Sequence, residues 1–253
     1  MSSLMKEIVT NGVFLLQCLG LVAGIFVVAR IIEKWEMKRN GVVEPVFTTR
    51  KLTMIGLFSA LAALLMIFEF PLPFAPGFYK LDFSEVPVMI AAFAFGPVAG
   101  IMVEFCKIIL NLLMDSTTTA FVGELANFCV GCAYVLPASI TYLYHKNKKS
   151  AIAGSVAGTI ILTVFGSAFN AIYLLPKFAE LYGMPMEALV GMGTAVNPAI
   201  TDVGTLVLFA VVPLNILKGT AVSLITIAVY KKLSVLIKSC NGAAGKKQVA
   251  DWS

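Results

Sequence analysis

Long apolar runs joined by short connections constrain this chain more than any other feature of its sequence. A helix that crosses a bilayer needs about 20 apolar residues, and most of the runs reach that length. Hydrophobic residues make up 59% of the 253 and charged residues 13%, against about 25% charged in soluble domains. We therefore predict an all-α integral membrane protein. The runs occupy residues 12–32, 51–69, 86–96, 98–114, 119–144, 151–175 and 204–230, of which 86–96 is too short to span unless its ends extend.

Lysines and arginines gather in three places: the connection after the first run, the loop near 145–150 and the C-terminal tail. Positively charged residues stay on the cytoplasmic side of membrane proteins, and seven alternating spans put all three places on one side. The N-terminus, the loop 70–85 and the connection 176–203 are then outside, and the C-terminus is cytoplasmic. Topology thus explains the net charge of +5, and nucleic acid is not a predicted partner.

A charged segment separates the first run from the others. Residues 33–50 have the composition of a solvated linker, so residues 1–49 are predicted to form an extra N-terminal transmembrane helix with a cytoplasmic linker. Residues 50–235 form a six-helix membrane domain, and residues 236–253 form a cytoplasmic tail predicted to be disordered. The connection 176–203 is amphipathic, and we expect it to fold back over the membrane surface.

The segment FPLPFAPGFYKLDFSEVP, residues 70–87, is unlike an ordinary connection between spans. Its prolines restrict the backbone, its aromatic rings offer apolar cover, and Lys80 and Asp82 offer polar contacts. A restricted loop loses less entropy when it closes over a ligand. We therefore predict that this segment is a lid over a pocket at the outer face.

Ionisable and amide side chains inside apolar runs are costly, so each is a candidate functional residue. Asn170 lies near the outer end of the run 151–175, while Asn215 and Lys218 are three residues apart on one helical face. Pro213 removes a backbone donor nearby and can open carbonyl groups toward a cavity. Lys218 either extends to the membrane interface or donates to a ligand carbonyl, and the sequence leaves both explanations open.

Two further pairs have competing explanations. Glu104 and Lys107 are also three residues apart, and mutual neutralisation inside the bundle is favoured over a role in coupling or partner contact. Glu124 and Asn127 either form hydrogen bonds between helices or point into a site beneath the loop 70–85.

Small residues recur at four-residue spacing on the second run, where Gly56 precedes Ala60 and Ser59 precedes Ala63. Such spacing lets another helix approach closely, and that helix is either a neighbour in the bundle or part of an external protein. Cys129 and Cys132 have redox-like spacing, but their apolar surroundings favour helix packing.

Four motifs, FAPGFYKLDFSEVP, GELANF, NAIYLLP and PLNILKG, follow one another along the chain. Together they resemble the riboflavin-specific S components of energy-coupling factor (ECF) transporters, over residues of about 50 to 235. The first apolar run lies outside the six-helix pattern of that family, and the connection 176–203 is longer than the family's. The resemblance implies a six-helix S-component bundle preceded by one extra transmembrane helix.

This resemblance also implies a function and a set of partners. Such subunits sit in the bacterial cell membrane, capture riboflavin outside and release it inside together with a transmembrane coupling protein and two ATPase subunits. The chain has no Walker motif, which agrees with ATP hydrolysis on other chains. Riboflavin is here the transported ligand, and no cofactor is implied.

Carried over by motif, the resemblance assigns two sets of residues. The docking strip for the coupling protein is Gly56, Ala60 and Ala63. The substrate-binding residues are Tyr79, Lys80, Leu81, Asp82, Asn170, Asn215 and Lys218, with Glu124 and Asn127 as weaker candidates.

Two alternatives remain. An S component for FMN or another vitamin would have the same fold, but a phosphate is usually bound by arginine forks, and the outer segments have no arginine pair. An intramembrane enzyme needs a nucleophile and base, or metal ligands, at one depth. A single histidine, His145, and the lack of HExxH and GxSxG motifs argue against an enzyme and a metal site.

Overall fold

A computed structural model describes residues 12–39, 48–115, 119 and 121–239, with side chains described between residues 19 and 230 of these ranges. Apart from one short hairpin, the described elements are helical, which confirms the predicted all-α fold. In chain order they are α2 (Gly12–Arg39), α3 (Thr49–Ile67), β1 (Phe70–Pro71), β2 (Lys80–Leu81), α4 (Glu85–Phe95), α5 (Pro97–Asp115), α6 (Val122–Tyr144), α7 (Lys148–Phe169), the π-helix η1 (Asn170–Leu174), α8 (Leu175–Tyr182), α9 (Met186–Thr194), α10 (Val203–Leu206), the π-helix η2 (Val207–Val211) and α11 (Val212–Ser239).

Five stretches of the described chain are long and apolar enough to cross a membrane. The helix α4, with 11 residues, is apolar but shorter than a span. It is joined to α5 by Gly96, whose φ of 96° lies in a region that glycine adopts without strain, and Pro97 then begins α5. The five stretches are Thr49–Ile67, Pro97–Asp115, Val122–Tyr144, Lys148–Tyr182 and Val203–Tyr230.

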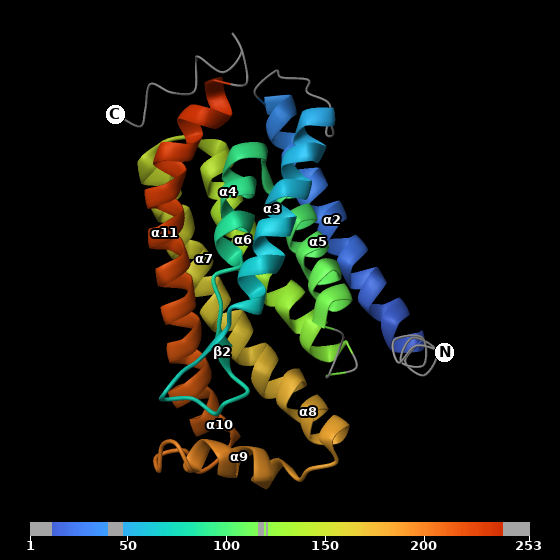
Figure 1. The fold of residues 1–253 in the computed structure, drawn as a ribbon, viewed down its shortest axis with the longest axis vertical. Coiled ribbons are helices and arrows are strands. Elements are labelled where there is room, and N and C mark those ends of the chain that lie inside the picture. The colour runs from blue at the N-terminus through green and yellow to red at the C-terminus, as the bar shows by residue number, and fades with distance from the viewer. Residues whose placement is uncertain (1–11, 40–47, 116–118, 120, 240–253) are drawn as a thin grey trace.

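Successive long helices run in opposite directions and give the bundle two chemically different ends (Figure 1). The β1–β2 hairpin and α9 lie together at one end, which we call the loop end. The opposite end, called the basic end, contains the end of α2, the start of α3 and the turn between α6 and α7. All three places carry lysine or arginine, so the alternation expected from the positive residues matches the path of the chain.

Side-chain caps determine where several helices begin. Thr48 accepts a hydrogen bond from the backbone N–H of Lys51 at 3.2 Å, and Asn147 accepts one from Ser150 at 2.8 Å. Asp202 forms a capping box with Thr205 at the start of α10. These oxygen acceptors pair backbone N–H groups that have no partner within the helix.

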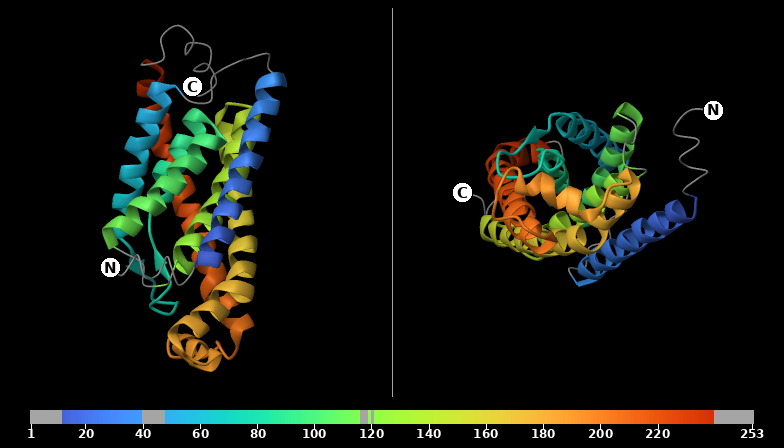
Figure 2. Two further views of the ribbon diagram at one scale, coloured as in Figure 1. Left: turned by 90° about the vertical axis from the view of Figure 1, so that its right-hand side faces the viewer. Right: turned by 90° about the horizontal axis from the view of Figure 1, so that it is seen from below.

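The helix α2 lies outside the ring formed by the other helices, as the view from below shows (Figure 2). It packs on α5 and α6 through buried Ala29 and through Phe26, whose ring meets Phe105 edge to face at 6.2 Å. The predicted solvated linker 33–50 is wrong for its first part, because α2 continues to Arg39. Glu33 is only 6% exposed, since its carboxylate pairs with Lys51 at 3.3 Å.

Other predicted boundaries differ from those in the structure or lie outside the described residues. The helix α11 continues to Ser239, so the predicted tail 236–253 begins at least four residues too early. Residues 1–11, 40–47 and 240–253 lie outside the described residues, and the predictions made for them stay predictions.

The connection 176–203 forms helices rather than an irregular loop. Figure 1 shows α9 lying across the loop end, at a steep angle to the long helices. Leu189, Val190 and Ile200 are buried, and Val190 and Ile200 share an apolar cluster with Ala75 and Tyr79 of the hairpin loop. The α8–α10 connection and the 70–85 loop therefore form one packed layer.

Glycines bring α7 close to both of its neighbours. A Cβ at Gly158 would lie 2.6 Å from the carbonyl oxygen of Tyr134 on α6. A Cβ at Gly219 of α11 would lie 2.7 Å from the side chain of Thr159. Small residues at helix contacts let backbones approach in this way, which explains why α7 packs closely against both α6 and α11.

Candidate functional site

The predicted lid contacts the first residue of η1, directly after α7, through a buried hydrogen bond. The Tyr79 hydroxyl donates to Oδ1 of Asn170 at 2.8 Å, and both side chains are buried. Tyr79 is held by the hairpin loop, where its ring lies 4.6 Å from that of Phe78. Burial of the Tyr79 hydroxyl raises its pKa above the usual range, so this group remains a neutral donor. Two residues predicted separately, 91 positions apart, thus form one contact.

A π-helix lies next to each of the helices α7 and α11. Asn170 begins η1, and η2 ends two residues before Pro213. Each π-helix is followed closely by a proline, Pro176 or Pro213, which cannot donate a backbone hydrogen bond. Single π-helical turns occur often at functional sites, and here Asn170 begins η1 while Asn215 follows η2 by four residues.

Asn215 and Lys218 both face the interior from α11. Asn215 is 4% exposed, and no described residue accepts a hydrogen bond from its Nδ2. Lys218 Nζ lies 2.9 Å from Oδ2 of Asp82 and 3.9 Å from Oε1 of Glu85. Of the two explanations for Lys218, extension to the membrane interface is therefore wrong, because its ammonium pairs with carboxylates of the loop and of α4.

Asp82 links the lid to α11. It accepts hydrogen bonds from the backbone N–H of Ser84 at 2.8 Å and from the Ser84 hydroxyl. Burial alone would raise the pKa of this carboxyl, but the positive charges of Lys218 and Lys107, together with the Ser84 hydroxyl, outweigh burial and hold the pKa well below its usual range. Asp82 is therefore a carboxylate under all physiological conditions.

A second lysine extends this pair into a buried cluster. Lys107 Nζ lies 2.7 Å from Oε1 of Glu104, 3.0 Å from Oε1 of Glu85 and 3.2 Å from the Ser84 hydroxyl. The predicted neutralisation of Glu104 by Lys107 is confirmed. With Asp82 and Lys218 these residues form what we call the buried charge cluster, which contains three carboxylates and two ammonium groups.

Glu85 and Ser84 were missed as site residues by sequence reasoning. They lie at the C-terminal end of the lid segment, where a short apolar helix begins, so their sequence context indicates only a helix start. The available signal was a charge directly before an apolar run, with a lysine, Lys107, on the helix that follows.

Four predicted site residues do not join these contacts. Lys80 is exposed and pairs with Glu69 across the hairpin, and Leu81 is buried in the apolar layer. Glu124 accepts a hydrogen bond from the Thr119 hydroxyl at 2.9 Å, while Asn127 is exposed.

The predicted docking strip on α3 is only partly exposed. Gly56 and Ala60 are exposed, with open space around Gly56. Ala63 is 1% exposed and Ser59 is also buried. Ala63 is therefore covered by the bundle and does not belong to an exposed strip. Positions 56 and 63 are separated by about two helical turns and lie at nearly the same angle around α3, so the cover differs along the length of the helix.

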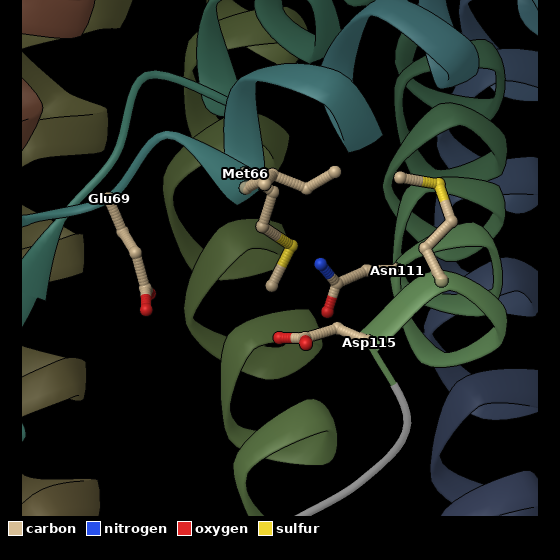
Figure 3. Close-up of a pocket in the computed structure, with 6 residues that line it drawn as sticks. Met66, Glu69, Asn111 and Asp115 are labelled. Atoms are coloured by element: carbon tan, nitrogen blue, oxygen red, sulfur yellow. The ribbon is translucent and has the colours of Figure 1, made fainter.

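A groove opens between the ends of α3 and α5 (Figure 3). None of the predicted substrate-binding residues lines this groove. Asn111 lies beside Asp115, and Glu69 lies on the opposite side of the groove. The lining residues are Met66, Ile67, Glu69, Asn111, Met114 and Asp115.

Comparison with known proteins identifies relatives along most of the chain. Residues 50–230 match the family model described as "ECF transporter, substrate-specific component". The chain is 35% identical over 189 residues to the riboflavin transporter RibU of Staphylococcus aureus (strain TCH60), covering 75% of this chain and 93% of the relative. It is 28% identical over 197 residues to the riboflavin transporter FmnP of Bacillus subtilis (strain 168), covering 77% and 97%.

A solved structure shows the same fold. The S component of a bacterial ECF transporter superposes with a TM-score of 0.59 at 34% sequence identity. The match covers 75% of this chain and 98% of the solved one. The family match begins at residue 50, so α2 lies outside it.

Proposed function

This chain belongs to the family of substrate-specific components of ECF transporters, and on that premise we propose that it is a riboflavin-binding subunit of an ECF-type importer. It is a multi-pass protein of the cell membrane. The family consists of transporter components, which removes the alternative of an intramembrane enzyme. Two relatives that cover three quarters of the chain are named riboflavin transporters, and this naming supports riboflavin as the ligand.

The observation that carries the proposal is the convergence of lid, α7 and α11 on a small set of polar groups. Asn170 begins η1 at the end of α7, while Asn215 and Lys218 lie on α11. The lid reaches them through Tyr79 and Asp82. The site thus combines aromatic cover from the loop with donors and acceptors from the helices.

These groups match the chemistry of a flavin. The isoalloxazine ring is flat and apolar over its body, and its carbonyl oxygens and ring nitrogens lie at one edge. Amides such as Asn170 and Asn215 both donate and accept, whereas Lys218 only donates. The buried Nδ2 of Asn215 needs an acceptor, which a ring carbonyl or nitrogen supplies. Each such bond contributes about 0.5–1.5 kcal/mol net.

The lid contacts define what riboflavin must replace. Lys218 Nζ bonds to Asp82 and the Asn170 amide bonds to Tyr79. When the lid opens, a riboflavin carbonyl replaces Asp82 as the acceptor from Lys218, and the ring N–H replaces Tyr79 as the donor to Oδ1 of Asn170. Lid aromatics then cover the ring face at a gain of about 0.5–1.5 kcal/mol beyond area burial. The ribityl hydroxyls need polar partners from the lid, for which Lys80 and Asp82 remain the proposed residues.

The partners and the topology are part of the same proposal. The loop end is outside and the basic end is cytoplasmic, which places the N-terminus outside and the C-terminus inside. A transmembrane coupling protein and two ATPase subunits supply the energy. The coupling protein docks on the exposed face of α3 at Gly56 and Ala60, where open space permits close helix approach.

FMN is less suited to this site than riboflavin. The chain has three arginines, which lie on α2 and at the start of α3: Arg30, Arg39 and Arg50. None of them can form a bidentate pair with a phosphate at the loop end. Competitive titration with riboflavin and FMN checks this order of preference. Equal affinity for the two ligands contradicts it.

Alanine variants test the site. Asn215→Ala and Lys218→Ala are each expected to weaken riboflavin binding by at least about tenfold, since each removes a buried donor. Lys177→Ala is the matched control, because Lys177 is an exposed lysine that pairs only locally with Glu180. Unchanged affinity in both test variants, measured by flavin fluorescence quenching in detergent, refutes the site assignment.

A further inference from the structure

Gly166 lies on α7 one turn before Asn170 and faces Asn215 across the interface with α11. A Cβ built at Gly166 would lie 2.8 Å from Nδ2 of Asn215, and its three nearest heavy atoms all belong to that amide. Real Cβ atoms do not approach so closely, so the Asn215 amide occupies the space that a side chain at position 166 would need.

The backbone of Gly166 also contacts the other amide. Its carbonyl oxygen accepts a hydrogen bond from Nδ2 of Asn170 at 3.1 Å. This bond turns Oδ1 of Asn170 toward the lid, where it accepts from Tyr79. One residue therefore touches both amides of the site, one through its carbonyl and the other through its missing side chain.

From this geometry we propose that Gly166 is a positioning residue for ligand binding, which holds the Asn170 and Asn215 amides in the register that a flavin edge requires. The inference rests on the proposed riboflavin function and adds a residue that touches no ligand. Gly166 keeps the Nδ2 group of Asn215 buried, without a protein acceptor and available to a ligand carbonyl or ring nitrogen. The ligand class that fits this donor is thus a planar heterocycle with acceptors at one edge.

Ordinary helix packing does not account for Gly166. Gly154 and Gly158 lie on the same helix, but the atoms nearest to their added Cβ are backbone carbonyl oxygens of α6. Gly219 of α11 contacts the Thr159 side chain, away from the amides. Gly166 differs because its only close neighbour is a buried polar group with no partner among the described residues.

Four variants of the full-length protein test the proposal by riboflavin titration with fluorescence quenching. Gly166→Ala is expected to weaken binding by at least about tenfold, because the new methyl group displaces the Asn215 donor. The double variant G166A/N215A is expected to bind like Asn215→Ala, since the displaced group is already absent. Gly219→Ala introduces comparable crowding at the same helix pair and is expected to bind like wild type.

Each outcome decides a different point. If Asn215→Ala binds normally, the proposed flavin site fails, whatever Gly166 does. If Asn215→Ala is weakened but Gly166→Ala binds normally, the role of Gly166 is wrong. If the double variant is weaker than Asn215→Ala, or Gly219→Ala is as weak as Gly166→Ala, position 166 acts through general packing and the proposal is overturned. If Gly166→Ala does not fold, restoration of folding by Asn215→Ala supports the steric link, and lack of restoration refutes it.

Discussion

Lys107 is the group whose loss should disturb the membrane domain most. Its ammonium lies between Glu104 at 2.7 Å and Glu85 at 3.0 Å, and its side chain is 1% exposed. Replacement by methionine keeps much of the volume but removes the charge. The buried charge cluster would then hold three carboxylates against Lys218 alone, which is 3.9 Å from Glu85 and already paired with Asp82.

The expected cost follows from burial. Removing one partner of a buried ion pair leaves an uncompensated charge and costs about 3–5 kcal/mol. For a chain of this size that loss corresponds to a fall in melting temperature of about 6–20 °C. Glu104→Gln removes one of the three negative charges, so the double variant K107M/E104Q leaves fewer carboxylates without a partner and is expected to recover part of the loss.

Thermal unfolding in detergent, followed by tryptophan fluorescence, measures these shifts. Lys177→Met is the matched control, because its pair with Glu180 is exposed and such pairs contribute about 0–1 kcal/mol. A melting temperature for Lys107→Met equal to that of the control would refute the reasoning, because the cluster would then not depend on its central charge.

Three further predictions concern the lid, the coupling surface and α2. Because the folded pKa of Asp82 is depressed, its stabilising pair with Lys218 is complete above about pH 4 and is lost only as the pH falls through the lower folded pKa. Melting temperatures should therefore show no Asp82-dependent fall between about pH 8 and pH 5. At lower pH, Asp82→Asn should make the melting temperature fall less steeply than in the wild type. A fall above pH 5 that is absent in Asp82→Asn contradicts this prediction. Gly56→Leu should leave riboflavin binding unchanged, because a Cβ at Gly56 meets nothing, but should lower ATP-driven uptake with the coupling subunits; wild-type uptake contradicts docking there. Deletion of residues 1–45 should keep riboflavin binding and lower the melting temperature, since the Phe26–Phe105 and Glu33–Lys51 contacts are lost; loss of binding in the folded deletion variant contradicts a purely packing role.

The spans were predictable because the bilayer dictates their length and composition. The C-terminal end of α2 was not predictable, because residues 33–39 are rich in charged side chains, a composition typical of a solvated segment. Glu33 is buried because it pairs with Lys51, 18 positions later. A linker and a helix with paired charges differ only through this tertiary contact, which composition cannot show.

The candidate site was predictable as a set of residue types and not as a set of contacts. An amide or a lysine inside an apolar run signals function by its cost in the membrane, which singled out Asn170, Asn215 and Lys218. The partner of Lys218 is Asp82, 136 positions away, and only the packing of lid on bundle reveals it. The prediction for Ala63 failed for a related reason, because periodicity groups residues into faces without showing how much of a face neighbouring helices cover.

The proposed function requires that this chain binds riboflavin at the loop end of the bundle without the coupling and ATPase subunits. Equilibrium titration of riboflavin into the purified full-length protein, followed by quenching of flavin fluorescence, tests that claim most directly. If the chain binds riboflavin, binding is saturable at one riboflavin per chain, is weakened by Lys218→Ala and is unaffected by Lys177→Ala. A folded preparation, shown by its cooperative thermal transition, that neither contains riboflavin nor can be loaded with it would contradict the account.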